Sequence, residues 1–488
     1  MTKTFNHRQF FRILGLLLLI ETAFMLAAAC VALCYHEPDA KSLLEASGIA
    51  ALVAMVGLLV GRKADHHIGT REGYSVVAVV WVVFSLFGML PFWLSGCIAS
   101  PIDAFFETMS GFTTTGATIL TDIEALPHGL QLWRCVTQWL GGMGIVVLSL
   151  ALLPFFGGGM QLFVAEVPGP TYDKLQPRLK NTARRLWALY VALTVAETLL
   201  LKIGGMNFFD AVCHAFTTMG SGGYSTKQAS IAHWTSPFIH YTIIVFMLIT
   251  SINYVLLYLA IVKRQFGRFW KDEELRTYLI ITAVATIAIT FGLGCTQASP
   301  NDNFEPIFRK SLFQVTSIFS TTGFAISDYV GWMPLLQFIL ILLMFSGGTA
   351  GSTSGGMKVV RLLLLAKNGY YEMKRLIHPK AILPVRINGH VVPEKTINSI
   401  HAFIIIYVAL IIVGTGVVAL SGLSVTESFG AVLACISNVG PAIGALGPMG
   451  DYAALPDFVK LFLAFIMLVG RLEIFTVLIL FSPGFWKK

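Results

Sequence analysis

Charged residues are scarce in this 488-residue chain, because Asp, Glu, Lys and Arg make up 12% of it and hydrophobic residues 56%. A soluble globular domain carries about 25% charged residues, so the composition excludes a soluble enzyme of two or three domains. The apolar residues form long unbroken runs, unlike the alternating strands of a transmembrane β-barrel. The sequence therefore predicts an all-α polytopic membrane protein.

Motifs for catalysis, for metal clusters and for organic cofactors are also missing. The 11 histidines make no HExxH spacing and the seven cysteines make no CxxC pair. The Gly-rich stretch near residue 350 lacks the GK[ST] of a phosphate-binding loop. A membrane-embedded enzyme needs a nucleophile with its base, or a cluster of metal ligands. We therefore expect a protein that is not an enzyme and holds no organic cofactor.

Apolar segments long enough to span a bilayer, which takes about 20 helical residues, number ten on our count of the sequence. The predicted spans are 11–34, 43–61, 74–96, 130–156, 186–203, 238–262, 277–294, 334–366, 397–421 and 458–482. With the N-terminus inside, the cytoplasmic segments carry 26 of the 34 Lys and Arg residues (3, 3, 5, 5, 8 and 2). This asymmetry predicts that both termini are cytoplasmic. Because most Lys and Arg residues lie in the predicted cytoplasmic segments, the net charge of +8 reflects membrane orientation. No nucleic-acid partner is therefore expected.

Four short apolar stretches lie outside these spans, and each is too short to cross the bilayer. Aligned without gaps they read DAFFETMSGFTTTG, DAVCHAFTTMGSGG, KSLFQVTSIFSTTG and ESFGAVLACISNVG, and cover residues 103–116, 210–223, 310–323 and 427–440. We interpret them as re-entrant half-helices in four span–half-helix–span repeats around a central pore. In the second repeat the register is open between Gly223, which the gap-free alignment favours, and Gly220.

The repeat divides the chain into five parts. They are two extra N-terminal transmembrane helices (1–70), pore repeat 1 (71–160), pore repeat 2 (161–270), pore repeat 3 with an intramembrane loop (271–375) and pore repeat 4 (376–488).

Small residues end each of the four stretches. Their backbone carbonyls and hydroxyls can replace the hydration shell of an alkali cation, and the half-helices would point their negative dipole ends at the ion. Close helix packing through small residues is the structural alternative, but four such tracts at one repeat position favour a filter. The predicted filter residues are Thr114, Thr115, Gly116, Ser221, Gly222, Gly223, Thr321, Thr322, Gly323, Asn438, Val439 and Gly440.

The eighth predicted span is interrupted by a polar, Gly-rich stretch. Its first apolar part, 335–345, covers about 16 Å of helix and would stop inside the bilayer, so we predict a mobile barrier loop below the filter. The predicted gating residues are Gly347, Gly348, Thr349, Ala350, Gly351, Ser352, Thr353, Ser354, Gly355, Gly356 and, in the last span, Arg471. We expect Arg471 to lie mid-helix without a nearby partner, because Glu473 would face away from it.

Among the acidic residues within the predicted membrane segments, four are assigned specific alternatives. Asp103 and Asp210 are predicted to cap their half-helices. Glu21 and Glu197 fit either packing or proton coupling, so the sequence leaves a passive channel and a proton symport both open.

These residues together resemble the Trk/Ktr/HKT superfamily of potassium uptake proteins, from about residue 74 to the end. The resemblance is carried by Thr114 to Ala117, Gly222 to Tyr224, Thr321 to Phe324, Asn438 to Pro441, the break in span eight and Arg471. The two extra N-terminal spans are similar to the TrkH/TrkG branch. The resemblance implies K⁺ as the transported ion, a bacterial cytoplasmic (inner) membrane location and a homodimer. It also implies a cytosolic nucleotide-binding regulatory ring (TrkA-like).

Alternatives to a potassium pore stay open at this point. A sodium-permeable pore of the same fold fits the same loops, and a secondary transporter of another solute would use the broken helix as a midplane site. The basic segment 358–395 is expected to contact anionic membrane lipid or the cytosolic partner.

Overall fold

The structure is a computed structural model that describes residues 5–62, 69–142, 144, 179–296 and 304–486. Within these ranges nearly all regular structure is helical, and two short strand pairs accompany the helices. Six helices are long and apolar enough to cross a membrane, or up to eight spans if two bent helix pairs each count as one. The ten predicted spans are therefore not all present as continuous helices. Part of the predicted span 130–156 lies outside the described residues.

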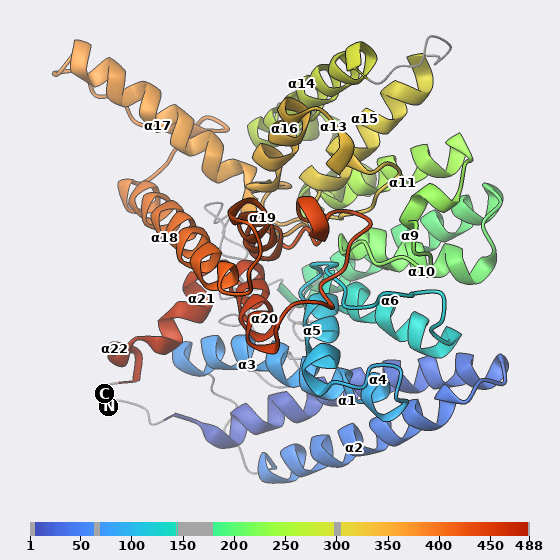
Figure 1. Cartoon of the computed structure of the whole chain (residues 1–488). Coiled ribbons are helices and arrows are strands. Elements are labelled where there is room, and N and C mark those ends of the chain that lie inside the picture. Colours follow the sequence, from blue (N-terminus) through green and yellow to red (C-terminus); the bar gives the residue numbers. More distant parts are fainter. Residues whose placement is uncertain (1–4, 63–68, 143, 145–178, 297–303, 487–488) are drawn as a thin grey trace.

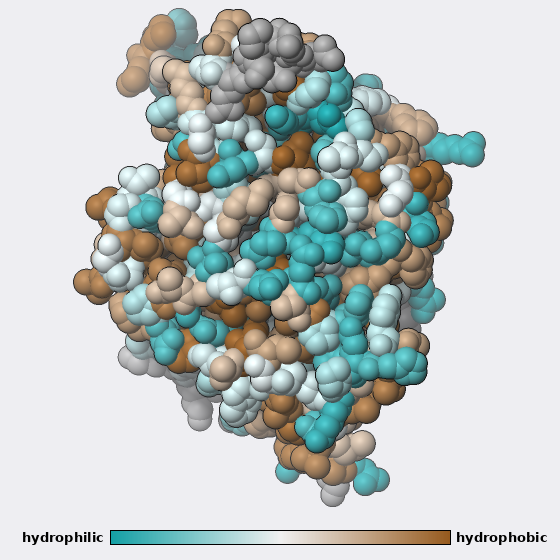
Figure 2. Space-filling model, turned by 45° about the vertical axis from the view of Figure 1, so that its right-hand side comes forward, coloured by the Kyte–Doolittle hydropathy of each residue, from teal (hydrophilic) through white to brown (hydrophobic). Residues whose placement is uncertain are grey.

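The six candidate spans are spread over the whole chain. They are α1 (His7–Cys34), α2 (Asp39–Val60), α3 (Thr70–Gly88) continued by α4 (Leu90–Leu94), α9 (Leu179–Ile203), α14 (Glu273–Thr296) and α18 (Glu394–Ala419). Large apolar side chains on these helices are exposed, such as Leu52 at 67%, Ile203 at 75% and Phe291 at 74%. Figure 2 shows brown apolar residues spread over much of one face. Exposure on this scale suits a surface covered by lipid.

The first two helices, α1 and α2, run beside one another along one edge of the molecule, at the bottom of Figure 1. Gly15 lies so close to α2 that a Cβ there would meet the backbone oxygen of Ala54 at 2.6 Å. Small residues allow membrane helices to approach in this way. The pair also contacts α3 and α6 (His128–Gly142), so it packs against the rest of the chain.

Two predicted spans are sharply bent, which the sequence analysis missed. The span 238–262 consists of α11 (Pro237–Thr250) and α12 (Tyr254–Ile261), which meet at 110°. The Asn253 side chain accepts hydrogen bonds from the first N–H groups of α12 and so starts a new helix there.

The last predicted span, 458–482, is broken in the same way. It consists of α20 (Asp457–Arg471) and α21 (Phe475–Leu478) with η5 (Ile479–Phe481), which meet at 112°. Glu473 and Ile474 have positive φ angles of 54° and 61°, which a right-handed helix does not allow.

Four shorter helices cover most of the stretches that were predicted to be re-entrant. They are α5 (Pro101–Phe112), α10 (Phe208–Gly220), α15 (Phe304–Phe319) and α19 (Val425–Ile436). The prediction that Asp103 and Asp210 cap these helices is wrong, because the caps are Ser100 and Asn207, three residues earlier. Asp103 instead pairs with Lys460 of α20 at 2.6 Å, and Asp210 accepts from Thr226 at 2.6 Å.

The interruption of the eighth predicted span is present. α16 (Pro334–Met344) ends before β1 (Ser346–Gly347), which pairs in parallel with β2 (Met357–Lys358), and α17 (Val359–Ile377) follows. This pairing brings the two ends of residues 346–356 together. α17 then projects from the body of the molecule (Figure 1) and leads to a hairpin of β3 (Arg386–Ile387) and β4 (His390–Val391).

Candidate functional site

Four loops with the same backbone geometry follow the four short helices. We call residues 113–116, 221–223, 320–323 and 437–440 the first to fourth glycine loops. Each has a left-handed residue two positions before its last glycine. The φ pairs are 53° and 84° at Thr114 and Gly116, 57° and 74° at Ser221 and Gly223, 59° and 80° at Thr321 and Gly323, and 53° and 90° at Asn438 and Gly440. Gly223 is therefore the glycine equivalent to the other three, whereas Gly220 is the last residue of α10.

The four glycine loops close into a ring. A Cβ added to the last glycine of each loop would overlap a backbone carbonyl of the next loop. That carbonyl belongs to the residue immediately before the last glycine of the next loop. The pairs are Gly116 with Gly222, Gly223 with Thr322, Gly323 with Val439, and Gly440 with Thr115. Because the fourth loop meets the first, the loops follow one another around a common axis. Side chains larger than hydrogen are excluded at all four glycines by this close approach.

Hydrogen bonds to the neighbouring helices α6 and α20 hold the loops in place. Gln138 of α6 donates to the Gly222 carbonyl at 2.8 Å and accepts from the N–H of Tyr224 at 3.0 Å. Asn438 donates to the Thr115 hydroxyl and to the Met467 carbonyl, each at 3.0 Å. The ring is thus braced from α6 on one side and from α20 on the other.

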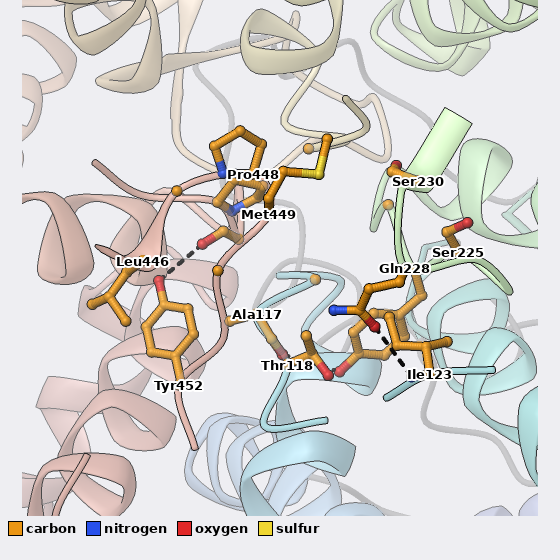
Figure 3. A pocket seen from close by; sticks show the side chains of 18 of the residues that line it. Ala117, Thr118, Ile123, Ser225, Gln228, Ser230, Leu446, Pro448, Met449 and Tyr452 are labelled. Carbon is orange, nitrogen blue, oxygen red and sulfur yellow. Dashed lines mark hydrogen bonds between the residues drawn. The ribbon is translucent and has the colours of Figure 1, made fainter. Parts of the chain in front are cut away.

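A cavity opens on one side of the ring, and all four last glycines line it (Figure 3). Its wall comes from the segments that follow the glycines, including Ala117, Ser225 and Pro441. Tyr452 reaches across to donate to the Gly440 carbonyl at 2.9 Å. This side of the ring is therefore open to a small hydrated solute.

A buried ion pair supports the first and second glycine loops from behind, and the sequence analysis did not find it. Arg134 Nε lies 2.6 Å from Glu107 Oε1, and the two side chains are 2% and 1% exposed. Arg134 also donates to the Ser225 carbonyl at 3.0 Å and stacks over the Tyr224 ring at 3.5 Å. Glu107 accepts from the N–H of Ile119 at 3.0 Å. The available signal was an acidic residue, Glu107, in one predicted membrane segment and a basic residue, Arg134, in the next.

Residues 346–356, which we call the covering loop, lie against the other side of the ring. The hydroxyls of Thr353 and Ser221 are 2.9 Å apart, and the Gly355 N–H donates to the Thr321 hydroxyl at 2.7 Å. Gly355 also packs on Asn438, where an added Cβ would meet the Asn438 Cβ at 2.6 Å. The covering loop therefore contacts the left-handed residue of three of the four glycine loops.

Arg471 binds the covering loop, so the prediction that it has no nearby partner is wrong. Its guanidinium donates to the Thr353 carbonyl at 2.8 Å and to the carbonyls of Gly141 at 2.6 Å and Gly142 at 3.2 Å. The prediction failed because α20 ends at Arg471 and does not continue past it. Carbonyls at the end of a helix such as α6 carry partial negative charge and suit a guanidinium. Glu473 does turn away, and it pairs with Arg361.

The covering loop is also tied at its base. Lys358 donates to the Ser354 carbonyl, and its ammonium lies 3.5 Å from the Gly355 carbonyl.

Among the residues the structure describes, no group of three or more His, Cys, Asp or Glu side chains is placed to hold a metal ion.

The fold and these loops define a helical membrane protein with four quasi-equivalent loops around one axis. A sequence profile of TrkH, described as a cation transport protein, matches residues 44–488. The chain belongs to this family.

Relatives and a solved structure match nearly the whole chain. The Trk system potassium uptake protein TrkH of Halomonas elongata is 39% identical over 99% of both chains. TrkG of Escherichia coli K12, also named a Trk system potassium uptake protein, is 33% identical over 97% of both. The crystal structure of the potassium transporter TrkH from Vibrio parahaemolyticus has a TM-score of 0.89 at 34% identity and covers 98% of this chain and 99% of that one.

Proposed function

We propose that this chain takes up K⁺ across the bacterial cytoplasmic membrane through the ring of glycine loops. The observation that carries the proposal is the closed ring in which each last glycine meets a carbonyl of the next loop. Rings of backbone carbonyls replace the hydration shell of an alkali cation without a fixed charge that would trap it. The predicted filter residues all belong to these loops. The names of the relatives, which are potassium uptake proteins, support the same ion.

The proposed topology has ten membrane crossings with both termini in the cytoplasm. It counts each bent pair as one crossing, adds α16 with α17 as another, and adds the segment that starts with α6. The four span–half-helix–span repeats and the five-part division of the chain belong to this proposal. It is supported by the equal backbone geometry of the four glycine loops and by the distribution of Lys and Arg.

The covering loop is the proposed gate. It touches three glycine loops on the side opposite the open cavity, so an ion leaving the ring on that side meets the loop. Arg471 ties this gate to the end of α6 through three carbonyls. A cytosolic nucleotide-binding ring of the TrkA type, a homodimer and anionic lipid are the proposed partners. They are supported by the words "Trk system" in the relatives' names and by the basic segment 358–395.

The test of the proposed function is cation flux into liposomes that contain the purified full-length protein. We expect K⁺ influx that exceeds Na⁺ influx by at least about tenfold. Equal K⁺ and Na⁺ flux would favour the sodium-permeable pore. If no cation crosses even in a variant without Arg471, the pore is contradicted and the transporter of another solute is favoured. Repeating the assay with a pH gradient separates proton symport from passive flux, with Glu21→Gln and Glu197→Gln as the variants to compare.

Arg471→Ala is expected to raise K⁺ flux about tenfold or more, because hydrogen bonds to a charged group each contribute roughly 1.5–3 kcal/mol. Losing them frees the covering loop and removes a positive charge from the ion path. Initial rates of K⁺ influx into liposomes measure the effect. Arg309→Ala is the matched control, because that arginine pairs with Glu305 within α15, away from the covering loop. An unchanged or lower rate for Arg471→Ala would contradict its role in the gate.

Glu124→Gln is expected to lower K⁺ influx about twofold to threefold at low ionic strength. Lys227 lines the cavity, and its ammonium is held by Glu124 at 2.9 Å. The hydrogen bond from Lys227 lowers the pKa of Glu124, so the pair persists above that lowered pKa and is lost as the pH falls through it. The substitution leaves the Lys227 charge uncompensated beside the ion path at every pH.

The same comparison at about 1 M salt, where the Debye length is about 3 Å, should abolish the difference. Glu45→Gln, in an exposed pair with Lys41 on α2, is the control and should change nothing. A decrease for Glu124→Gln that persists at high salt would contradict the electrostatic explanation.

A further inference from the structure

Three consecutive acidic residues lie at the start of α14, where Asp272 precedes the helix and Glu273 and Glu274 are its first two residues. They face two different parts of the molecule. Glu274 is 6% exposed, and its carboxylate points to the covering loop. Asp272 and Glu273 contact the β3–β4 hairpin. The three residues occupy less than one turn of helix, so a shift at the hairpin contact also shifts the contact with the covering loop.

Glu274 holds the covering loop at two places. The same carboxylate oxygen, Oε1, accepts from the N–H of Ala350 at 2.8 Å and from the N–H of Val360 at 3.0 Å. Ala350 lies within the covering loop, and Val360 is the second residue of α17, just beyond the loop. Unpaired N–H groups at a helix start favour a carboxylate. One buried carboxyl group therefore bridges the loop and the helix that follows it.

The next contact fixes the same part of the loop from the opposite direction. The Ala350 carbonyl accepts from the Asn253 side chain at 2.7 Å, and the Gly351 carbonyl accepts from the Tyr254 N–H at 3.0 Å. Asn253 lies at the bend between α11 and α12. The covering loop is thus held between that bend and Glu274, and the Glu274 contact is its link to α14.

The hairpin grips the residues that immediately precede Glu274. The Asn388 side chain accepts from the Glu273 N–H at 2.8 Å and donates to Asp272 at 2.9 Å, and the Asn388 N–H donates to the Glu273 carboxylate at 3.0 Å. Lys367 of α17 pairs with Glu273 and donates to the Arg386 carbonyl at 2.9 Å. A movement of the hairpin therefore shifts the first turn of α14, and Glu274 shifts with it.

The geometry points to an acidic latch, formed by Asp272, Glu273 and Glu274, that transmits the position of the β3–β4 hairpin to the covering loop. Glu274 is a positioning residue that keeps the covering loop against the glycine loops, and Asn388 is the residue through which the hairpin holds Glu274 in place. The hairpin is exposed, with Val391 55% accessible, so a cytosolic protein that displaces it would release the latch. The inference rests on the proposed function, because it takes the covering loop to be the gate.

The test measures K⁺ influx into liposomes that hold the full-length protein without any partner. Glu274→Ala is expected to raise the initial rate about tenfold, the size of a lost charge-assisted hydrogen bond. Glu274→Gln keeps an acceptor oxygen at the same place and should stay near the wild-type rate. Glu372→Ala is the matched control, since this glutamate pairs with Arg375 on α17 and does not contact the covering loop.

Asn388→Gly tests the hairpin half of the latch. Glycine tolerates the left-handed backbone at this position, where φ is 49°, so the change removes the side-chain contacts alone. We expect an increase of about threefold, and the double variant with Glu274→Ala should be no faster than Glu274→Ala by itself. Hydrogen exchange at Ala350 and Val360 should also accelerate in Asn388→Gly, which touches neither residue.

Arg471→Ala, measured in parallel, distinguishes a failure of the latch from a failure of the gate. If it raises influx while a normally eluting Glu274→Ala protein does not, the latch is overturned and the gate survives. The latch is also overturned if Asn388→Gly and Glu274→Ala act independently, or if exchange at Ala350 and Val360 is unchanged in Asn388→Gly. If neither Arg471→Ala nor Glu274→Ala raises influx, the covering loop is not the gate and the latch falls with it.

Discussion

Replacing Gly323 by Ser is expected to reduce the preference for K⁺ over Na⁺ at least about tenfold, the largest functional change among our predictions. A Cβ at residue 323 would overlap the Val439 carbonyl and lie 2.9 Å from Pro441 Cδ. The carbonyl must turn or retreat, so the ring loses a ligand at the position where the third and fourth glycine loops meet. The φ angle of 80° adds strain for any side chain. Influx of K⁺ and Na⁺ into liposomes, measured side by side, gives the ratio.

Gly422→Ser is the control that separates the effect of backbone strain from the effect of the overlap with the Val439 carbonyl. Gly422 has a similar φ of 88°, and no atom of the residues that the structure describes lies within 4 Å of an added Cβ. Gly422→Ser should therefore cost some stability and leave the selectivity ratio unchanged. A Gly323→Ser protein with wild-type selectivity would contradict the carbonyl ring as the filter.

Arg134→Met is expected to destabilise the folded protein by about 3–5 kcal/mol, because it leaves the Glu107 carboxylate buried without its counter-charge. The pair is almost fully excluded from solvent, and Arg134 also contacts Tyr224 and the Ser225 carbonyl at the second glycine loop. Unfolding in a titration with denaturing detergent, followed by Trp fluorescence, measures the loss. The selectivity of any protein that remains folded should fall as well, since the support of the first two loops is gone.

Two further variants test whether the effect of Arg134→Met comes from the buried, uncompensated Glu107 carboxylate. Arg309→Met, in a pair whose glutamate is 49% exposed, should cost no more than about 1 kcal/mol. Combining Glu107→Gln with Arg134→Met removes the uncompensated charge and should recover part of the lost stability. A loss below about 1 kcal/mol for Arg134→Met alone would show that Glu107 is neutralised by other means.

Much of the site could be predicted because it repeats along the chain. The gap-free alignment of four short stretches predicted loops that share one backbone geometry, and the structure shows the same φ pattern at Gly116, Gly223, Gly323 and Gly440. The break near residue 350 was equally legible, since an apolar run of eleven residues cannot cross a bilayer. Both signals are local, so each depends only on neighbours in the sequence.

The errors arose where hydropathy and helical spacing carry no signal, either for a local change of backbone direction or for a contact with a distant part of the chain. The runs 238–262 and 458–482 are apolar throughout, and hydropathy alone does not reveal that Asn253 starts a new helix or that Glu473 and Ile474 turn the chain. The partners of Arg471 come from residues 141–142 and 353, more than 100 positions away. Its environment was therefore beyond any argument from helical spacing.

The sequence by itself determined the class of protein, the number of glycine loops and their spacing, because hydropathy and a repeat are properties of order along the chain. Only the tertiary structure decided that the loops close into a ring, since that requires Gly440 to meet Thr115. It also decided what the buried acidic residues contact. Glu107 with Arg134, and Glu274 with the covering loop, are contacts between separate elements. Because these groups are buried, losing one partner costs more free energy than the same loss would cost at the surface.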